Sequence, residues 1–356
     1  MLKIFIMTHF AQLLKKWYNL NGRALPWRKT SDPYKIWVSE IILQQTRVEQ
    51  GTKYYHNFLR AFPDVDALAS ASETEVMQQW QGLGYYSRAR NMHHAAKAIV
   101  TEYNGLIPQT YKKIKTLKGI GPYTASAIAS FAFNQPYAVV DGNVFRVLAR
   151  VYAIETPIDA LQGKKKFEDL ANQLLDREDP ATHNQAIMEL GALICKPATP
   201  LCSECPLANI CQSRTNGTQT RYPVKSARKP RRKRFLNFLI ILYRGRYVVE
   251  KRDGNDIWKG LFQFPLIETP EKISNKDLDE KLKELTPLYL NHAPILEKKH
   301  ILTHQELHAI FHKIHWPDEQ ELPKAFMKDE TFICSREELK KLPFPQLIKQ
   351  NLDLLL

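Results

Sequence analysis

Two carboxylate residues, Glu40 and Asp141, have local settings that would give them different acid–base properties. Asp32-Pro33 predicts a helix start upstream of Glu40, because it supplies an N-cap followed by a proline at the first helical position. Glu40 would share one face of this helix with a mostly apolar set: Ile36, Trp37, Leu43 and Gln44. Burial there would raise the pKa of Glu40 and make it a candidate proton donor. The alternative is a structural carboxylate, paired with an arginine or exposed at the rim of the face.

Asp141 stands at the start of another expected helix, in the run Val-Asp-Gly-Asn-Val. A helix N-terminus stabilises an anion, so we expect the pKa of Asp141 to move in the direction opposite to that of Glu40. One proton donor and one permanently charged carboxylate form the pair of groups that glycoside cleavage uses. A simple helix cap is the other interpretation of Asp141.

A glycine-bearing turn precedes Asp141 by about twenty residues, in the run Leu-Lys-Gly-Ile-Gly-Pro-Tyr-Thr. Gly119 and Gly121 allow positive φ and a close backbone approach to a ligand, and Pro122 suits the first position of a helix. Backbone amides at a helix start attract phosphate. We therefore expect helix, hairpin and helix, with the hairpin as a phosphate contact.

Four of the five cysteines lie together, with six, two and five residues between them: Cys195, Cys202, Cys205 and Cys211. On chemistry alone this set suits either zinc or an iron–sulfur cluster. Cys334 stands apart and is interpreted as a buried apolar residue.

The composition favours a polyanionic partner, because 51 lysines and arginines oppose 37 acidic residues and the formal net charge is +14. We expect a cytoplasmic protein without a signal peptide or membrane span, with translation starting at Met1 or Met7. A chain of 356 residues has room for two domains. Residues 225–234 contain seven cations and no acid, which predicts a solvated linker or one laid along DNA.

The hairpin run and Val-Asp-Gly-Asn-Val together resemble the signature of the endonuclease III superfamily of DNA glycosylases. The run Trp-Val-Ser-Glu-Ile-Ile-Leu-Gln-Gln-Thr-Arg-Val around Glu40 is more similar to the adenine DNA glycosylases. This resemblance implies that Glu40 protonates the adenine ring and Asp141 stabilises the sugar oxocarbenium ion. Tyr123 and Asn143 would help to position Asp141. Tyr123 occupies the position of the lysine that forms a Schiff base in strand-cleaving members, so a monofunctional enzyme is implied.

The resemblance also implies a 4Fe–4S cluster on the four cysteines and a set of DNA contacts. The predicted DNA-binding residues are Gln44, Gln45, Thr46, Leu83, Tyr85, Arg88, Gly119, Gly121, Gln185, Thr303 and His304. Leu83 and Tyr85 would wedge or stack in the duplex, Arg88 would reach a phosphate, and Gln185 would lie at the adenine pocket. Each assignment has a structural alternative. The turn with Leu83 and Tyr85 could be a core turn that carries a packed tyrosine, Gln44 and Gln45 could be a solvated helix end, and Gln185 could be an ordinary helix residue.

The expected fold is multidomain. An all-α helix-hairpin-helix glycosylase domain spans residues 8–224, with the hairpin near 117–130 and the iron–sulfur loop at 195–211. After the linker, residues 235–356 resemble the α/β Nudix-like domain of adenine DNA glycosylases, which recognises 8-oxoguanine. Strands are expected at 235–243 and 247–250, and a helix at 276–285.

The acidic Nudix box is missing, so we expect no pyrophosphate hydrolysis. The usual Phe-Ser-His loop reads Leu302-Thr303-His304.

Histidines recur every four residues at 300, 304, 308 and 312, which on a helix would suggest a metal site. The surrounding β-branched and aromatic residues favour a strand instead, so zinc is not expected.

The expected activity is removal of adenine paired with 8-oxoguanine or guanine in double-stranded DNA, by a monomer associated with the nucleoid. A monofunctional glycosylase for another mismatched base is one alternative. A non-catalytic iron–sulfur DNA-binding or redox-responsive protein is another, although binding phosphate requires neither Glu40 nor Asp141.

Overall fold

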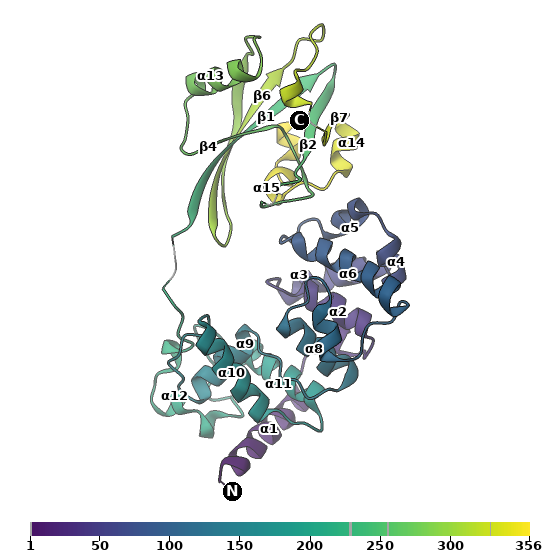
Figure 1. Ribbon diagram of the computed structural model, residues 1–356. Coiled ribbons are helices and arrows are strands. Elements are labelled where there is room, and N and C mark those ends of the chain that lie inside the picture. Colours follow the sequence, from purple (N-terminus) through teal and green to yellow (C-terminus); the bar gives the residue numbers. More distant parts are fainter. Residues whose placement is uncertain (1, 228–229, 255, 328) are drawn as a thin grey trace. The chain divides into compact units, whose positions relative to one another are not determined.

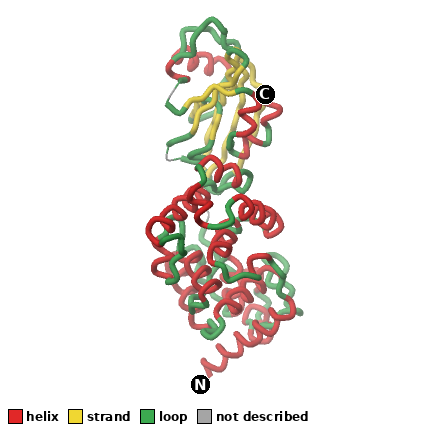
Figure 2. Tube along the Cα trace, turned by 90° about the vertical axis from the view of Figure 1, so that its right-hand side faces the viewer, coloured by secondary structure: helices red, strands yellow, loops and turns green. Residues whose placement is uncertain are grey.

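The computed structural model describes residues 2–227, 230–254, 256–327 and 329–356. The chain forms two compact units, which we call the helical unit (Met1–Ser70 with His94–Arg228) and the sheet unit (Ala71–His93 with Lys229–Leu356). In the described residues every strand lies in the sheet unit, as the yellow segments in Figure 2 show. No helix among these residues has both the length and the apolar character needed to cross a bilayer.

The helical unit is built from helices joined by loops (Figure 1). Its α-helices are α1 (Leu2–Asn21), α2 (Pro33–Ile42), α3 (Val48–Ala61), α4 (Val65–Ser70), most of α6 (Ser87–Tyr103), α7 (Tyr111–Thr116), α8 (Pro122–Phe133), α9 (Gly142–Val151), α10 (Leu161–Leu174), α11 (Pro180–Leu193) and α12 (Gln212–Thr215), and a 3-10 turn, η1, spans Pro26–Arg28. The connection from α11 to α12 carries the four clustered cysteines. Helices α1, α9, α10 and α11 enclose one apolar core, while α2 packs against α3 and α8.

Local capping chemistry sets the starts of the helices that carry the candidate residues. Asp32 caps α2 by accepting hydrogen bonds from the backbone of Tyr34 and Lys35, as Asp32-Pro33 predicts. The hairpin between α7 and α8 forms as expected, but the two glycines differ. Gly119 takes a φ of +80°, whereas Gly121 has a φ of −85° and is the N-cap of α8. Only Gly119 therefore needs the left-handed conformation that glycine allows.

The sheet unit contains α5 (Glu73–Trp80), the first turns of α6 and one mixed seven-stranded sheet in the order β3-β2-β1-β6-β5. The strands are β1 (Arg232–Tyr243), β2 (Arg246–Lys251), β3 (Phe262–Gln263), β4 (Leu266–Thr269), β5 (His292–Ile301), β6 (Gln305–His315) and β7 (Thr331–Cys334). Strands β1 and β6 run parallel, β4 pairs with β1, and β7 pairs with β2. The α/β architecture confirms the fold class expected from the sequence.

Helices cover both faces of this sheet, because successive side chains of a strand point to opposite sides. Phe238 and Ile240 of β1 belong to the core beneath α14 (Arg336–Lys341), α15 (Gln346–Lys349) and α16 (Leu352–Leu355). Leu239 and Ile241 belong to the core beneath α13 (Asn275–Leu285).

Several local predictions in the sheet unit are confirmed. The hairpin between β1 and β2 turns at Arg244 and Gly245, which both have positive φ, a conformation that matches the twist of the flanking strands. Helix α13 starts one residue before the predicted position. His308 and His312 lie in β6, so the histidine repeat is not a helical stripe.

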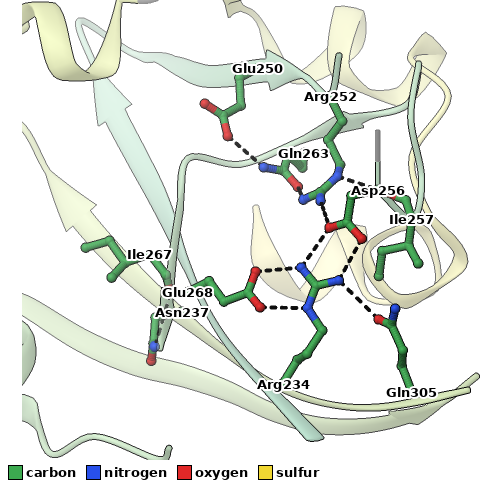
Figure 3. A network of polar contacts seen from close by, with 10 residues as sticks. All are labelled: Arg234, Asn237, Glu250, Arg252, Asp256, Ile257, Gln263, Ile267, Glu268 and Gln305. Atoms are coloured by element: carbon green, nitrogen blue, oxygen red, sulfur yellow. Dashed lines mark hydrogen bonds and ion pairs between the residues drawn. The ribbon is translucent and has the colours of Figure 1, made fainter. Parts of the chain in front are cut away.

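The basic run 225–234 differs from the solvated linker that its composition predicts. Two of its residues, Arg228 and Lys229, lie outside the described residues, and β1 already begins at Arg232. Arg234 is only 5% exposed. Its guanidinium donates paired hydrogen bonds to Glu268 and to Asp256, as Figure 3 shows.

The ion pairs explain how a cation from the basic run can be buried. Glu268 comes from β4, and Gln305 of β6 accepts a further hydrogen bond at 3.1 Å. Asp256 also accepts from Arg252 at 2.8 Å. The hydrogen bond to Glu268 is the largest cause that raises the pKa of the Arg234 guanidinium above its usual range, and the hydrogen bond to Asp256 acts in the same direction. A buried ion pair is tolerated when such bonds satisfy its polar atoms, and here they join β1, β4 and β6.

Candidate active site

A cavity of about 570 Å³ in the helical unit gathers most of the residues singled out in its sequence. Eight predicted site residues line it: Glu40, Gln44, Gln45, Thr46, Tyr123, Asp141, Asn143 and Gln185. They come from α2 and the loop after it, from α8, from the start of α9 and from α11. Segments as far apart in the chain as Glu40 and Gln185 therefore meet at one concave surface, which is the usual form of a small-ligand site.

Glu40 is buried in the wall of this cavity, with 5% of its surface exposed. The hydroxyl of Tyr123 donates a hydrogen bond to Glu40 Oε2 at 2.8 Å. The pKa of Glu40 is raised to about 7, chiefly by burial; the charge of Asp141 contributes to the rise, while the hydrogen bond from Tyr123 and the charge of Arg28 oppose it. Glu40 can therefore hold a proton near neutral pH, as its apolar helix face predicts.

Asp141 caps α9 and accepts three hydrogen bonds. The backbone amides of Asn143 and Val144 donate to Oδ1 at 2.9 and 2.8 Å, and the side-chain amide of Asn143 donates to Oδ2 at 2.7 Å. Three donors aimed at one carboxyl group favour its charged, acceptor-only form.

The expected opposite movement of the two pKa values is not what the structure shows. Burial raises the pKa of Asp141 as well, and the hydrogen bonds from Val144 and Asn143, with the charge of Arg146, counteract that rise. The sequence shows the helix start but not the depth of burial. What distinguishes the two carboxyls is their donors, since Glu40 accepts one hydrogen bond and Asp141 accepts three.

Tyr123 contacts a different carboxyl from the expected one. Its hydroxyl bonds to Glu40, whereas the sequence predicts that it supports Asp141. Asn143 does contact Asp141, and its own Oδ1 accepts a hydrogen bond from Arg146 at 2.8 Å. The helix-hairpin-helix thus supplies a donor for the proton-bearing carboxyl, while α9 holds Asp141 by itself.

The glutamines reach the same cavity from two sides. Gln44 donates to Thr124 at 3.3 Å, and Gln45 has a φ of +59°, a conformation that non-glycine residues adopt at few sites. Gln185 accepts a hydrogen bond from the hydroxyl of Tyr18 at 2.8 Å. Its position on α11 places it in the cavity wall, where the predicted base pocket would need it.

A buried ion-pair group in the cavity wall was missed by the sequence analysis. Glu189 on α11 bonds to both Arg23 and Arg28, and all three line the cavity. One signal was present, because Gln185 and Glu189 are four residues apart and must share a helix face. The partners could not be inferred, since they lie 166 and 161 residues away in the chain.

The turn at 82–88 in the sheet unit carries three other predicted DNA contacts. Tyr85 is 47% exposed with a φ of +48°, while Leu83 is buried. The Arg88 guanidinium donates to the carbonyl of Gly84 and lies over the Trp80 and Tyr85 rings, at 5.2 and 5.7 Å from their centroids. Arg88 therefore contacts its own turn, and the phosphate contact stays a prediction.

Tyr85 also contacts Thr303, another predicted DNA-binding residue. The hydroxyls of Tyr85 and Thr303 share a hydrogen bond of 2.6 Å, and His304 beside them is exposed. Gly119 and Gly121 are exposed at the hairpin, and nothing within 4 Å would meet a Cβ at Gly121. The hairpin backbone is thus open to a ligand.

The four clustered cysteines line one small cavity beside α9 in the helical unit: Cys195, Cys202, Cys205 and Cys211. Arg150, 2% exposed, places Nη1 3.3 Å from the Cys195 sulfur. Burial raises the pKa of the Cys205 thiol to about 12. Among the described residues, no group of three or more histidine, cysteine, aspartate or glutamate side chains is placed so that it could hold a single metal ion.

The comparisons with known proteins place this architecture in a class. Residues 38–174 match the family of HhH-GPD superfamily base excision DNA repair proteins, and residues 237–354 match the NUDIX domain. The structure of a thermostable thymine-DNA glycosylase aligns with a TM-score of 0.55 at 27% identity, over 59% of this chain and 97% of that one. The structure of a trapped endonuclease III–DNA covalent intermediate shares the fold, with a TM-score of 0.52 and 21% identity, over 60% of this chain and 98% of that one. Fold and site define a helix-hairpin-helix DNA glycosylase.

Sequence relatives narrow the class further. An adenine DNA glycosylase of Buchnera aphidicola subsp. Baizongia pistaciae is 40% identical over 72% of this chain and 73% of its own length. The adenine DNA glycosylase of Buchnera aphidicola subsp. Schizaphis graminum is 34% identical over 85% of this chain and 86% of its own length. The Homo sapiens enzyme is 34% identical over 85% of this chain and 66% of its own length. The chain belongs to the adenine DNA glycosylase family.

Proposed function

We propose that this glycosylase of base excision repair removes adenine paired with 8-oxoguanine or guanine in duplex DNA, by hydrolysis and without cutting the strand. The observation that supports this most is the pair of carboxyls at one cavity, Glu40 with its pKa near 7 and Asp141 held by three donors. We also propose that the protein is a cytoplasmic, nucleoid-associated monomer.

In the proposed reaction, Glu40 gives its proton to a ring nitrogen of adenine. The bond between the sugar C1′ and the base nitrogen then breaks, and its electron pair leaves with the base. Asp141 remains an anion and stabilises the positive charge that develops on the sugar. Water adds to C1′, and its released proton restores Glu40. Asn143 keeps Asp141 oriented through its 2.7 Å hydrogen bond, and Tyr123 keeps Glu40 oriented.

DNA would be held by the open hairpin at Gly119 and Gly121 and by the loop Gln44, Gln45 and Thr46. We propose that the sheet unit recognises 8-oxoguanine with Thr303 and His304. The hydrogen bond between Tyr85 and Thr303 supports this, since it joins the predicted wedge to the predicted recognition loop. Leu302 in the usual place of phenylalanine offers an aliphatic surface but no ring for stacking.

One experiment tests the substrate and the monofunctional chemistry together. Purified protein is incubated with duplexes differing at one pair, adenine opposite 8-oxoguanine, guanine or thymine, and half of each sample is treated with alkali. We expect breaks only after alkali, fastest opposite 8-oxoguanine. Borohydride should trap no adduct, because the phenol of Tyr123 cannot form an imine. A trapped adduct would overturn the monofunctional assignment, and binding without any abasic product would favour the non-catalytic alternative.

We further propose that Cys195, Cys202, Cys205 and Cys211 hold a 4Fe–4S cluster. Their donor set is four thiols around a shared cavity, and the buried Arg150 cation beside Cys195 suits the negative charge of bound thiolates. The cluster would order the loop that carries Lys196 and is not needed for the proton transfer. Analysis of the protein purified without oxygen should find about four iron and four sulfide per chain. A stoichiometric zinc content without sulfide would contradict the assignment.

A further inference from the structure

Glu189 is the most completely buried acidic side chain in the wall of the active-site cavity, with 0% of its side chain exposed. It accepts four hydrogen bonds. Arg23 donates to it through its backbone amide, Nε and Nη2 at 2.9, 2.7 and 2.7 Å, and Arg28 donates through Nη2 at 2.9 Å. The Arg23 contact is bidentate, a geometry that fixes direction as well as distance. None of these bonds is needed to start or end a helix.

The two arginines are held at the cavity by this single carboxylate. Arg28 also donates to the Arg23 carbonyl at 3.2 Å and lies over the Tyr18 ring, 5.6 Å from its centroid. Tyr18 in turn donates to Gln185. Glu189 is therefore the anchor of a connected group that forms one wall of the cavity.

Charge gives this anchor a chemical consequence. The groups that act on Glu40 are Tyr123 from α8, Asp141 before α9 and Arg28 from η1. Arg28 favours the ionised form of Glu40 and so works against a proton donor. Burial of Glu189 raises its pKa, but the hydrogen bonds from Arg23 and Arg28 prevail and lower it to about 2. Glu189 is thus an anion throughout the physiological range, and its charge opposes the effect of Arg28, which donates to it at 2.9 Å.

We propose that Glu189 is a positioning residue for base excision, which holds Arg23 and Arg28 in the cavity wall and offsets the charge of Arg28, so that Glu40 keeps its proton. This inference rests on the proposed role of Glu40 as the acid. Without Glu189, Arg28 would lose its ion pair with this carboxylate and remain a cation in the wall, because guanidinium groups do not lose their protons in proteins. The proton of Glu40 would then be lost at lower pH.

The test is the pH dependence of single-turnover adenine excision in Glu189→Gln, with saturating protein and a duplex holding adenine opposite 8-oxoguanine. The alkaline limb of the rate profile should move down by about one pH unit, the size expected when one nearby charge is removed. The rate deficit should accordingly be larger at pH 8 than at pH 6. Glu189→Asp, which keeps the charge, should restore the limb to its wild-type position.

A charge-matched double variant separates electrostatics from disruption of the wall. Glu189→Gln with Arg28→Gln removes one anion and one cation, so its limb should return toward the wild-type pH even if the rate stays low. Glu102→Gln, an exposed residue of α6, changes the net charge equally and should leave the profile unmoved. A uniform rate loss at every pH in Glu189→Gln would overturn the proposal. No adenine excision by the wild type would instead refute the proposed function.

Discussion

Replacing Glu40 with glutamine is expected to slow adenine excision by about 10³-fold, within the range that a positioned general acid contributes. Glutamine has nearly the same shape, and its carbonyl oxygen can still accept the Tyr123 hydrogen bond. It cannot give up a proton at neutral pH. The measurement is the single-turnover rate at saturating protein, so that weakened binding does not enter the result.

The pH profile of the wild type supplies a second readout for the same residue. Because burial raises the pKa of Glu40 to about 7, the acid form predominates below that pH and the excision rate should fall as the pH rises through it. The glutamine variant should lack this limb. Its affinity for the duplex, measured by fluorescence anisotropy, should match that of the wild type. A variant that keeps more than about a tenth of the rate would exclude Glu40 as the acid.

Local chemistry made much of the candidate site predictable. Asp32 and Asp141 are helix caps with their donors two and three residues away, so their positions follow from short runs of sequence. The hairpin at Gly119 and the turn at Arg244-Gly245 depend on nearby residues in the same way. Each of these features is closed by bonds within a few residues, which is the range over which sequence patterns carry information.

Contacts between distant segments were not predictable from such patterns. The parallel pairing of β1 with β6 joins residues about 70 positions apart, as Phe238 with Phe311 shows. Glu189 finds its arginines more than 160 residues away, and the hydroxyl of Tyr123 bonds to Glu40 across 83 residues. The pKa of Asp141 depends on such packing, because desolvation comes from every segment that covers the carboxyl. A helix N-terminus therefore indicates a stabilised anion without giving the direction of the pKa change.

Asp141 can serve both as a helix cap and as the charge that stabilises the reaction, and Asp141→Asn separates the two roles. Asparagine caps helices about as well as aspartate, and its oxygen can keep both backbone bonds from Asn143 and Val144. Its amide, however, would face the donor Nδ2 of Asn143 in place of an acceptor, and the negative charge is lost. We expect excision to slow by about 10²- to 10³-fold, the cost of losing a preorganised electrostatic contact.

The matched control is Asp32→Asn, because Asp32 also accepts from the backbone amides two and three residues further on, at the start of α2, and does not line the cavity. This variant should excise adenine within about twofold of the wild type, since an exchange of cap residues changes stability by only a fraction of a kcal/mol. Thermal denaturation of both variants shows whether either helix start is damaged. Equal rate losses in the two variants would mean that capping accounts for the whole effect. A large loss in Asp141→Asn alone, with both proteins folded, would assign that loss to the charge facing the sugar.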